Sequence, residues 1–231
     1  SSLYKKYKLF KSFKMSYLII TKKKWQKSNF KLLLKKFLVN DKLNFYTLKR
    51  IKPKIIFFIF WSSKIPKNVY ENYLCIQFHS SDLPNFRGGS PIQNQILKGV
   101  KFSKISAFRV NSKIDGGDIC LKEKINLIGS ARNIFLNIEK KIIKMIIILS
   151  QKKQITFYKQ KGKGSYFKRR EENASNLKLN KIKDMNEFYN LIRCTDAKGY
   201  PFAFINFKNF KIEFFDAKLK KNKIDAKIKI S

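Results

Sequence analysis

A run of apolar residues that ends at a single histidine constrains the fold of this chain more than any other feature. Residues 73–78 read Tyr-Leu-Cys-Ile-Gln-Phe, and His79, the only histidine of the chain, follows them directly. The next residues are rich in Ser, Asp, Pro and Gly, which is typical of a turn after a buried strand. In open α/β sheets ligands bind beyond the carboxyl ends of the strands, so we expect His79 at the rim of a cleft. A second acidic turn, at residues 115–118, is expected to bring a carboxylate to the same rim.

Residues 55–60 form a second run that is β-branched and aromatic throughout. Strands of a parallel sheet read this way because helices cover both faces of the sheet. The apolar spacing elsewhere predicts further strands at 17–21, 45–48, 104–110, 119–124, 202–207 and 211–215. It predicts helices at 25–39, 48–51, 67–72, 92–98, 130–149 and 185–193, with Ser130 as an N-cap. Residues 218–229 are expected to be a basic tail.

The stretch around His79 resembles a known family. The 10-formyltetrahydrofolate-dependent formyltransferases carry a strand ending Asn-x-His, then Ser-Leu-Leu-Pro and an Arg-Gly-x-x-Pro loop. Here Ser81-Asp82-Leu83-Pro84 and Arg87-Gly88-Gly89-Ser90-Pro91-Ile92-Gln93 follow His79. Asp115-Gly116-Gly117-Asp118 is similar to the family's Asp-x-Gly-Asp turn. Gln77 departs from the pattern, because the family has Asn at this position.

The resemblance implies a fold and a set of catalytic residues. The expected fold is α/β, a Rossmann-like formyltransferase domain with a parallel-rich central sheet and a short C-terminal α+β part. By analogy with the family, His79 donates to the oxyanion or shuttles a proton, because imidazole titrates near neutral pH. Asp115 orients His79 and accepts the proton of the amine. Gln77 keeps an amide that could donate to the formyl oxygen, but its side chain is longer than Asn.

The same resemblance implies 10-formyltetrahydrofolate as the formyl donor. The cofactor-binding residues expected from the matching loops are Ser63, Lys64, Ile65, Leu83, Pro84, Ser112, Lys113 and Ile114. The residues expected to contact the acceptor are Ser81, Asp82, Arg87, Gly88 and Gly89. The glycines allow close approach of the backbone, and Arg87 can pair with an anion such as a phosphate.

The charge of the chain is strongly positive, at +37 with 52 basic and 15 acidic residues. Only seven of the basic residues are arginine, and the lysines are spread along the whole chain together with abundant Asn, Ile and Phe. This pattern is the one expected of an A/T-biased coding sequence, and bidentate phosphate recognition favours Arg. We therefore interpret the lysines as a solvated surface in preference to a dedicated nucleic-acid groove.

The three cysteines are far apart and form no C-x-x-C pair, so we expect neither a disulfide framework nor a metal site. No apolar run approaches the ~20 residues that span a bilayer, which predicts a cytoplasmic protein. The expected organisation is a basic extension at residues 1–14, a catalytic domain at 15–155 and a C-terminal subdomain at 156–231.

The resemblance implies an N-formyltransferase that acts on a primary amine. A full C-terminal barrel of the methionyl-tRNA enzymes would extend beyond Ser231, so the favoured acceptor is small, such as the amino group of a nucleotide-linked sugar. Three alternatives stay open: methionyl-tRNA as acceptor, a catalytically impaired binding homologue because of Gln77, and nucleic-acid binding on charge alone. The oligomeric state has no signal in the sequence.

Overall fold

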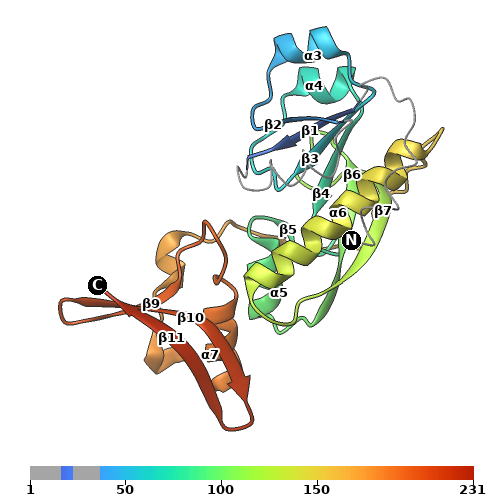
Figure 1. The fold of residues 1–231 in the computed structure, drawn as a ribbon. Helices are drawn as coiled ribbons and strands as arrows, with labels where there is room; N and C mark the ends of the chain where they lie inside the picture. The colour runs from blue at the N-terminus through green and yellow to red at the C-terminus, as the bar shows by residue number, and fades with distance from the viewer. Residues whose placement is uncertain (1–16, 23–36) are drawn as a thin grey trace, which may run out of the picture.

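A six-stranded sheet forms the centre of the N-terminal part of the molecule (Figure 1). We describe a computed structural model that places residues 17–22 and 37–231. In spatial order the strands are β2 (Leu38–Asn40), β1 (Tyr17–Thr21), β3 (Ile55–Ile59), β4 (Cys75–His79), β6 (Phe102–Arg109) and β7 (Ile119–Asn126). The first four strands are parallel to one another, whereas β6 and β7 form an antiparallel hairpin against β4. The predicted parallel-rich α/β fold is confirmed.

Strand β3 is apolar throughout because helices cover both faces of the sheet. All five of its residues are buried, and alternate residues point into two different hydrophobic clusters. Phe57 belongs to the cluster that contains Ile92 and Ile96 of α5 (Pro91–Leu97) and the buried face of the long helix α6 (Ala131–Gln151). On the other face, Phe58 belongs to the cluster that contains Leu48 of α3 (Phe45–Ile51) and Val69 of α4 (Lys67–Asn72). The continuous apolar run therefore follows from two-sided burial.

Two local predictions in the N-terminal part are wrong. Residues 45–48 lie in α3, where the side chain of Asn44 caps the helix by accepting from the backbone N–H groups of Tyr46 and Thr47. The cap outweighs the strand preference of the aromatic pair. The predicted helix at 25–39 falls mainly outside the described residues, but Leu38 and Val39 lie in strand β2.

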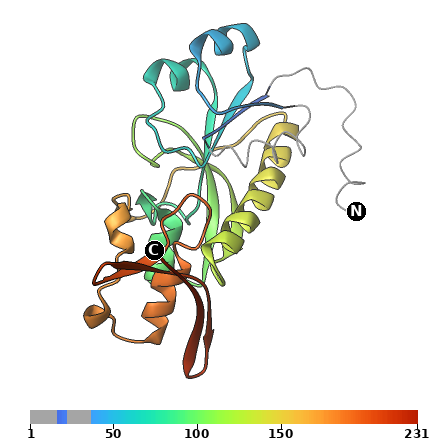
Figure 2. The ribbon, with the colours of Figure 1, turned by 60° about the vertical axis from the view of Figure 1, so that its left-hand side comes forward.

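The C-terminal part is a smaller α+β unit at the opposite end of the molecule from α3 and α4 (Figures 1 and 2). Helix α7 (Met185–Arg193) packs on a three-stranded antiparallel sheet in the order β11 (Lys223–Ile230), β10 (Phe210–Lys220) and β9 (Ala203–Phe207). Residues 218–229 are thus ordered strands, and the predicted tail is wrong. Two short 3₁₀ turns, Glu172–Ser175 and Leu179–Lys181, precede α7.

Arg193 at the end of α7 joins the two parts of the molecule. Its guanidinium donates to the backbone oxygens of Leu127 (2.6 Å) and Gly129 (2.8 Å), just before α6 begins. Next to it, the Asp196 carboxylate accepts from Arg132 of α6 (3.4 Å) and from the backbone N–H of Asp216 in β10 (2.9 Å). The C-terminal part is therefore fixed by polar contacts to the start of α6 and to the residues just before it.

Cys75, Cys120 and Cys194 are free thiols inside the core. Burial raises the pKa of Cys75 and of Cys120 to about 12, and that of Cys194 to about 11. Within residues 17–22 and 37–231, no helix has the length and apolar character needed to cross a membrane.

Candidate functional site

His79 lies at the carboxyl end of β4, where the sequence predicted it. Its side chain is buried, with a relative exposure of 6%. The strand ends there because the loop of residues 80–90 turns back toward the imidazole ring. Nε2 of His79 donates to the carbonyl oxygen of Phe86 in that loop at 2.7 Å. A carbonyl oxygen can only accept, so this contact places a ring proton on Nε2.

Asp115 faces the other nitrogen of the same ring. Nδ1 of His79 lies 3.5 Å from Oδ2 of Asp115, and the Asp115 side chain is buried as well. With the ring proton on Nε2, a neutral imidazole presents a lone pair at Nδ1 to the carboxylate. The contact becomes a hydrogen bond only when a further proton sits between the two groups. The predicted meeting of a base and a carboxylate is present in the structure, and the pair has room for one exchangeable proton.

The turn that carries Asp115 is shaped by a close backbone approach. Asp115 has φ +47°, in the left-handed region that Asp tolerates better than most residues. A Cβ atom added at Gly117 would lie 1.6 Å from the carbonyl oxygen of Arg109, so only glycine fits there. The Asp115 carboxylate also accepts the backbone N–H of Gly88 at 2.8 Å. The two loops expected at the site are therefore bonded to each other.

Gln77 lies two residues before His79, so its side chain emerges on the same face of β4. Its Nε2 donates to the carbonyl oxygen of Trp61 at 3.4 Å, a long contact. The amide therefore sits between the ends of β3 and β4. A role at the formyl oxygen stays a prediction.

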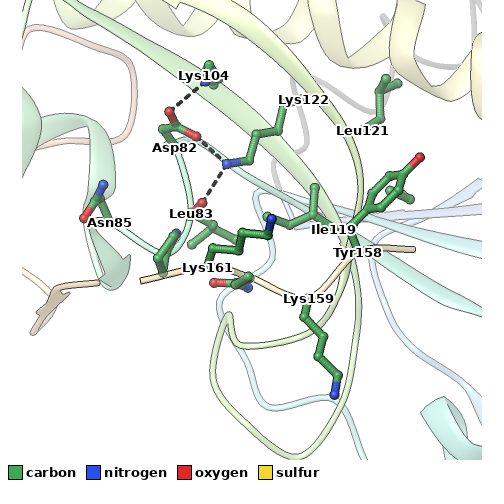
Figure 3. Close-up of a pocket in the computed structure, with 13 residues that line it drawn as sticks. Asp82, Leu83, Asn85, Lys104, Ile119, Leu121, Lys122, Tyr158, Lys159 and Lys161 are labelled. Carbon is green, nitrogen blue, oxygen red and sulfur yellow. Dashed lines mark hydrogen bonds and ion pairs between the residues drawn. The ribbon is translucent and has the colours of Figure 1, made fainter. Parts of the chain in front are cut away.

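Asp82 is held in ion pairs beside a cavity of about 620 Å³ (Figure 3). Its carboxylate contacts Nζ of Lys104 at 2.9 Å and accepts a short hydrogen bond from Nζ of Lys122. Lys122 also donates to the carbonyl oxygen of Leu83 at 2.6 Å, as the dashed lines in Figure 3 show. Partial burial alone would raise the pKa of Asp82, but the hydrogen bonds and charges of the two lysines outweigh it and lower the pKa. Asp82 thus anchors its loop to the β6–β7 hairpin.

Two other residues of this loop are buried, and Pro84 is partly exposed. Ser81 is fully buried, and its hydroxyl donates to the carbonyl oxygen of Asn85 at 2.6 Å. Leu83 packs against Phe108 and Ile119, and its N–H donates to Ser106 at 3.1 Å. Ser81 and Leu83 therefore stabilise the loop from inside. Pro84, which is partly exposed, lines the cavity of Figure 3.

The predicted folate-binding residues occupy three loops. Ile65, in the loop after β3, and Val110, at the start of the 111–118 loop, belong to the same hydrophobic cluster. The neighbouring side chains of these two loops are exposed at Ser63, Lys64, Ser112, Lys113 and Ile114. Leu83 and Pro84 line the cavity of about 620 Å³, whereas a second cavity of about 750 Å³ lies along β6 and β7. Neither cavity includes residues 63–65 or 112–114, so a single folate pocket stays a prediction.

The segment that connects the two parts of the chain, residues 158–169, is a component of the site that sequence reasoning missed. Gln160 accepts from the guanidinium of Arg87, and Ser165 accepts from the backbone N–H of Phe86 at 2.9 Å. Strand β8 (Tyr166–Phe167) pairs with β5 (Arg87–Gly88). Gly89 approaches this segment so closely that a Cβ would meet the backbone of Arg169 at 2.3 Å. Sequence reasoning placed the end of the catalytic domain at residue 155, just before this segment, and the segment carries no motif that would have revealed these contacts.

Comparisons with known proteins indicate the family of the chain. Residues 14–138 match the family described as "Formyl transferase", and residues 172–231 match "Methionyl-tRNA formyltransferase, C-terminal domain". The methionyl-tRNA formyltransferase of Clostridium beijerinckii is 27% identical over 183 residues, 76% of this chain and 58% of that protein. Across the curated relatives that are most similar, the matched region spans between 24% and 58% of the relative's own length.

Solved structures give the same family. A methionyl-tRNA formyltransferase from Clostridium thermocellum matches with a TM-score of 0.87 and 37% identity, over 94% of this chain and 99% of that one. A 4-N formyltransferase from Francisella tularensis shares the fold at a TM-score of 0.65 and 18% identity, over 83% and 92% of the two chains. Because the "Formyl transferase" match alone covers more than half of the residues, the chain belongs to the 10-formyltetrahydrofolate-dependent formyltransferase family.

Proposed function

We propose that this protein transfers the formyl group of 10-formyltetrahydrofolate to the amino group of methionyl-tRNA. The observation that carries the proposal is the match of residues 172–231 to the C-terminal domain of methionyl-tRNA formyltransferases. The likeness to the Clostridium thermocellum enzyme over nearly the whole of both chains supports it. The expectation of a small nucleotide-sugar acceptor rested on the shortness of the C-terminal part. That argument loses its force, because an enzyme named for methionyl-tRNA is matched over 99% of its own length.

The chemistry proposed for His79 and Asp115 follows from their geometry. Attack of a neutral amine on the formyl carbon creates an oxyanion and leaves an extra proton on nitrogen. The Nδ1–Oδ2 contact of 3.5 Å provides a place for that proton, since the two groups form a hydrogen bond once they share it. When the bond between the formyl carbon and the folate nitrogen breaks, that nitrogen needs one proton, and the proton that the amine gave to the His79–Asp115 pair would supply it. The loop contact of Nε2 with Phe86 keeps the ring oriented during this transfer.

Under this proposal the positive charge of the chain attracts the tRNA acceptor. A surface with a net charge of +37 attracts a polyanion from any side, which raises the rate of encounter with tRNA. Dispersed lysines contact phosphates without reading sequence, so such binding weakens strongly as salt rises. Selection of methionyl-tRNA would then depend on the site and not on the charge.

The decisive experiment offers the protein both kinds of acceptor with the same formyl donor. Methionyl-tRNA and a nucleotide-linked amino sugar are incubated separately with 10-formyltetrahydrofolate, and formylation is read as a mass gain on the acceptor. We expect transfer to methionyl-tRNA, with apparent affinity falling steeply between about 50 and 200 mM salt. Uncharged tRNA serves as the control for binding without reaction. Formylation of the sugar with methionyl-tRNA left unmodified would overturn the proposal, and formylation of neither would favour a catalytically impaired homologue.

A further inference from the structure

We propose that Gln160 is a positioning residue that holds the His79–Asp115 pair in its reactive geometry. The inference rests on the formyl transfer proposed above and adds to it a residue from outside the catalytic loops. Gln160 belongs to the connecting segment, residues 158–169, and touches neither ring nitrogen of His79 in the contacts described. It acts through the backbone of the turn that carries Asp115.

Both ends of the Gln160 side chain are fully used. Its Nε2 donates to the carbonyl oxygens of Asp115 and Gly117, each at 2.8 Å. Its Oε1 accepts from Nε (3.2 Å) and from the terminal nitrogen (2.6 Å) of Arg87. An amide has two N–H donors and one carbonyl oxygen that accepts twice, so all of its hydrogen bonds are satisfied here. One side chain therefore ties the Asp115 turn to the Arg87 loop.

The Asp115 turn needs such a restraint. A non-glycine residue at φ +47° occupies a sparsely populated conformation, which persists only when surrounding contacts hold it. The bond from Gln160 reaches the carbonyl oxygen of Asp115 itself. Release of that bond frees the turn to relax, and the Asp115 carboxylate then moves relative to His79. A displacement of about 1 Å is enough to cost roughly 10²-fold in rate.

The same connecting segment also holds the second partner of the His79 ring. The carbonyl oxygen of Phe86 accepts from Nε2 of His79, and the N–H of Phe86 donates to Ser165 at 2.9 Å. The Phe86 ring stacks on Phe167, with centroids 5.0 Å apart and planes at 10°. Both groups that face the imidazole are thus braced by residues 158–169. This segment leads to the C-terminal part. Its contacts with the Asp115 turn and with Phe86 therefore connect the C-terminal part to the His79–Asp115 pair.

The experiment uses the fact that His79 is the only histidine of the chain. In protein labelled with ¹⁵N-histidine, the two ring nitrogen signals report the proton position on His79 alone. The variants are Gln160→Met, which removes every bond of the amide, and Gln160→Glu, which keeps acceptors for Arg87 but loses both donors to the turn. Gln154→Met, at an exposed glutamine of the preceding stretch, is the matched control.

We expect both Gln160 variants to shift the His79 ring signals and to lower kcat by roughly 10 to 10²-fold, with little change in KM for the folate donor. Gln154→Met should match the parent chain in both measurements. Unchanged ring signals in a folded Gln160→Glu protein would overturn the proposal, even if Gln160→Met fails to fold. If the parent chain does not formylate methionyl-tRNA, the proposed function fails, but the ring signals still decide whether Gln160 positions the pair.

Discussion

The two larger sheets among the described residues are built from opposite sequence patterns. Strand β3 in the N-terminal sheet is Ile-Ile-Phe-Phe-Ile, and every residue is buried. Strand β11 in the C-terminal sheet is Lys-Ile-Asp-Ala-Lys-Ile-Lys-Ile, and none of its residues is buried. The continuous run belongs to a sheet with helices on both faces, whereas the alternating one belongs to a sheet with α7 on part of one face. The first sheet supplies the stable frame of the site, and the second supplies accessible surface.

The largest expected difference between the two regions is in stability. Phe57→Ala removes a fully buried ring that lies within 6.4 Å of the rings of Tyr17, Phe37 and Phe78, counted between centroids. We expect the free energy of unfolding to fall by about 3–5 kcal/mol. Ile228→Ala on β11, at a side chain that is 54% exposed, should change it by less than about 0.5 kcal/mol. Urea unfolding of both variants measures the contrast, and similar losses would show that the C-terminal sheet is part of the same cooperative core.

The second prediction tests the role proposed for Asp115 beside His79, as a group that takes up a proton. Asp115→Asn keeps the size of the side chain and tolerates the left-handed backbone, but it cannot take up a proton. We expect the rate of formyl transfer to fall by roughly 10² or more, while the melting temperature stays close to that of the parent. Asp118→Asn in the same turn is the matched control. Near-normal turnover of Asp115→Asn would remove Asp115 from the mechanism.

The third prediction concerns the junction between the two regions. Arg193→Met leaves the carbonyl oxygens of Leu127 and Gly129 without their donor, so we expect a loss of about 1–3 kcal/mol. Arg132→Met is a matched control, because the Arg132 side chain is 61% exposed and its pairing with Asp196 should contribute less than about 1 kcal/mol. Hydrogen exchange of the β9–β11 amides would locate the effect. Faster exchange confined to the N-terminal sheet would contradict the role given to Arg193.

The smallest expected effect is the pH dependence contributed by Asp82. Its pKa is lowered in the folded state, so its ion pairs contribute stability above the unfolded pKa of about 3.9. That contribution is lost as the pH falls through the lower folded value. Because the side chain is 38% exposed, solvent screening limits the effect to less than about 1 kcal/mol. Asp82→Asn should therefore be slightly less stable than the parent at pH 7, and the difference should shrink as the pH falls below about 3.9. Urea unfolding at both pH values measures the difference, and a constant value would rule out the charge as its cause.

The same contrast between regions explains what the sequence could and could not predict. The strands ending at Ile59 and His79 were predictable because each is buried and therefore has a run of apolar residues in the local sequence. The first part of the helix Phe45–Ile51 was predicted as a strand because a single cap at Asn44 decides where the helix begins. The ordered strands of residues 218–229 were missed because partly exposed strands, rich in Lys, resemble a solvated tail.

The candidate site divides in the same way. His79 and Asp115 could be found from motifs, since each lies in a short stretch with its own turn residues. Their mutual geometry could not, because it depends on Gln160, which is 45 positions from Asp115 in the sequence. No local pattern encodes a contact of that kind. The role of a side chain in a connecting segment can be recognised only from the folded structure.

The burial of the three thiols makes the protein suitable for site-directed labelling. The thiolate is the form of cysteine that attacks alkylating reagents, and burial raises the pKa of Cys75, Cys120 and Cys194 to about 11 to 12, so these thiols are almost fully protonated at neutral pH. A new cysteine at an exposed position would therefore react first without removal of the native ones. Tyr46→Cys on α3 and Ile228→Cys on β11 offer such positions, with exposures of 86% and 54%. A dye pair on these two sites would report whether the ends of the molecule approach each other when an acceptor binds.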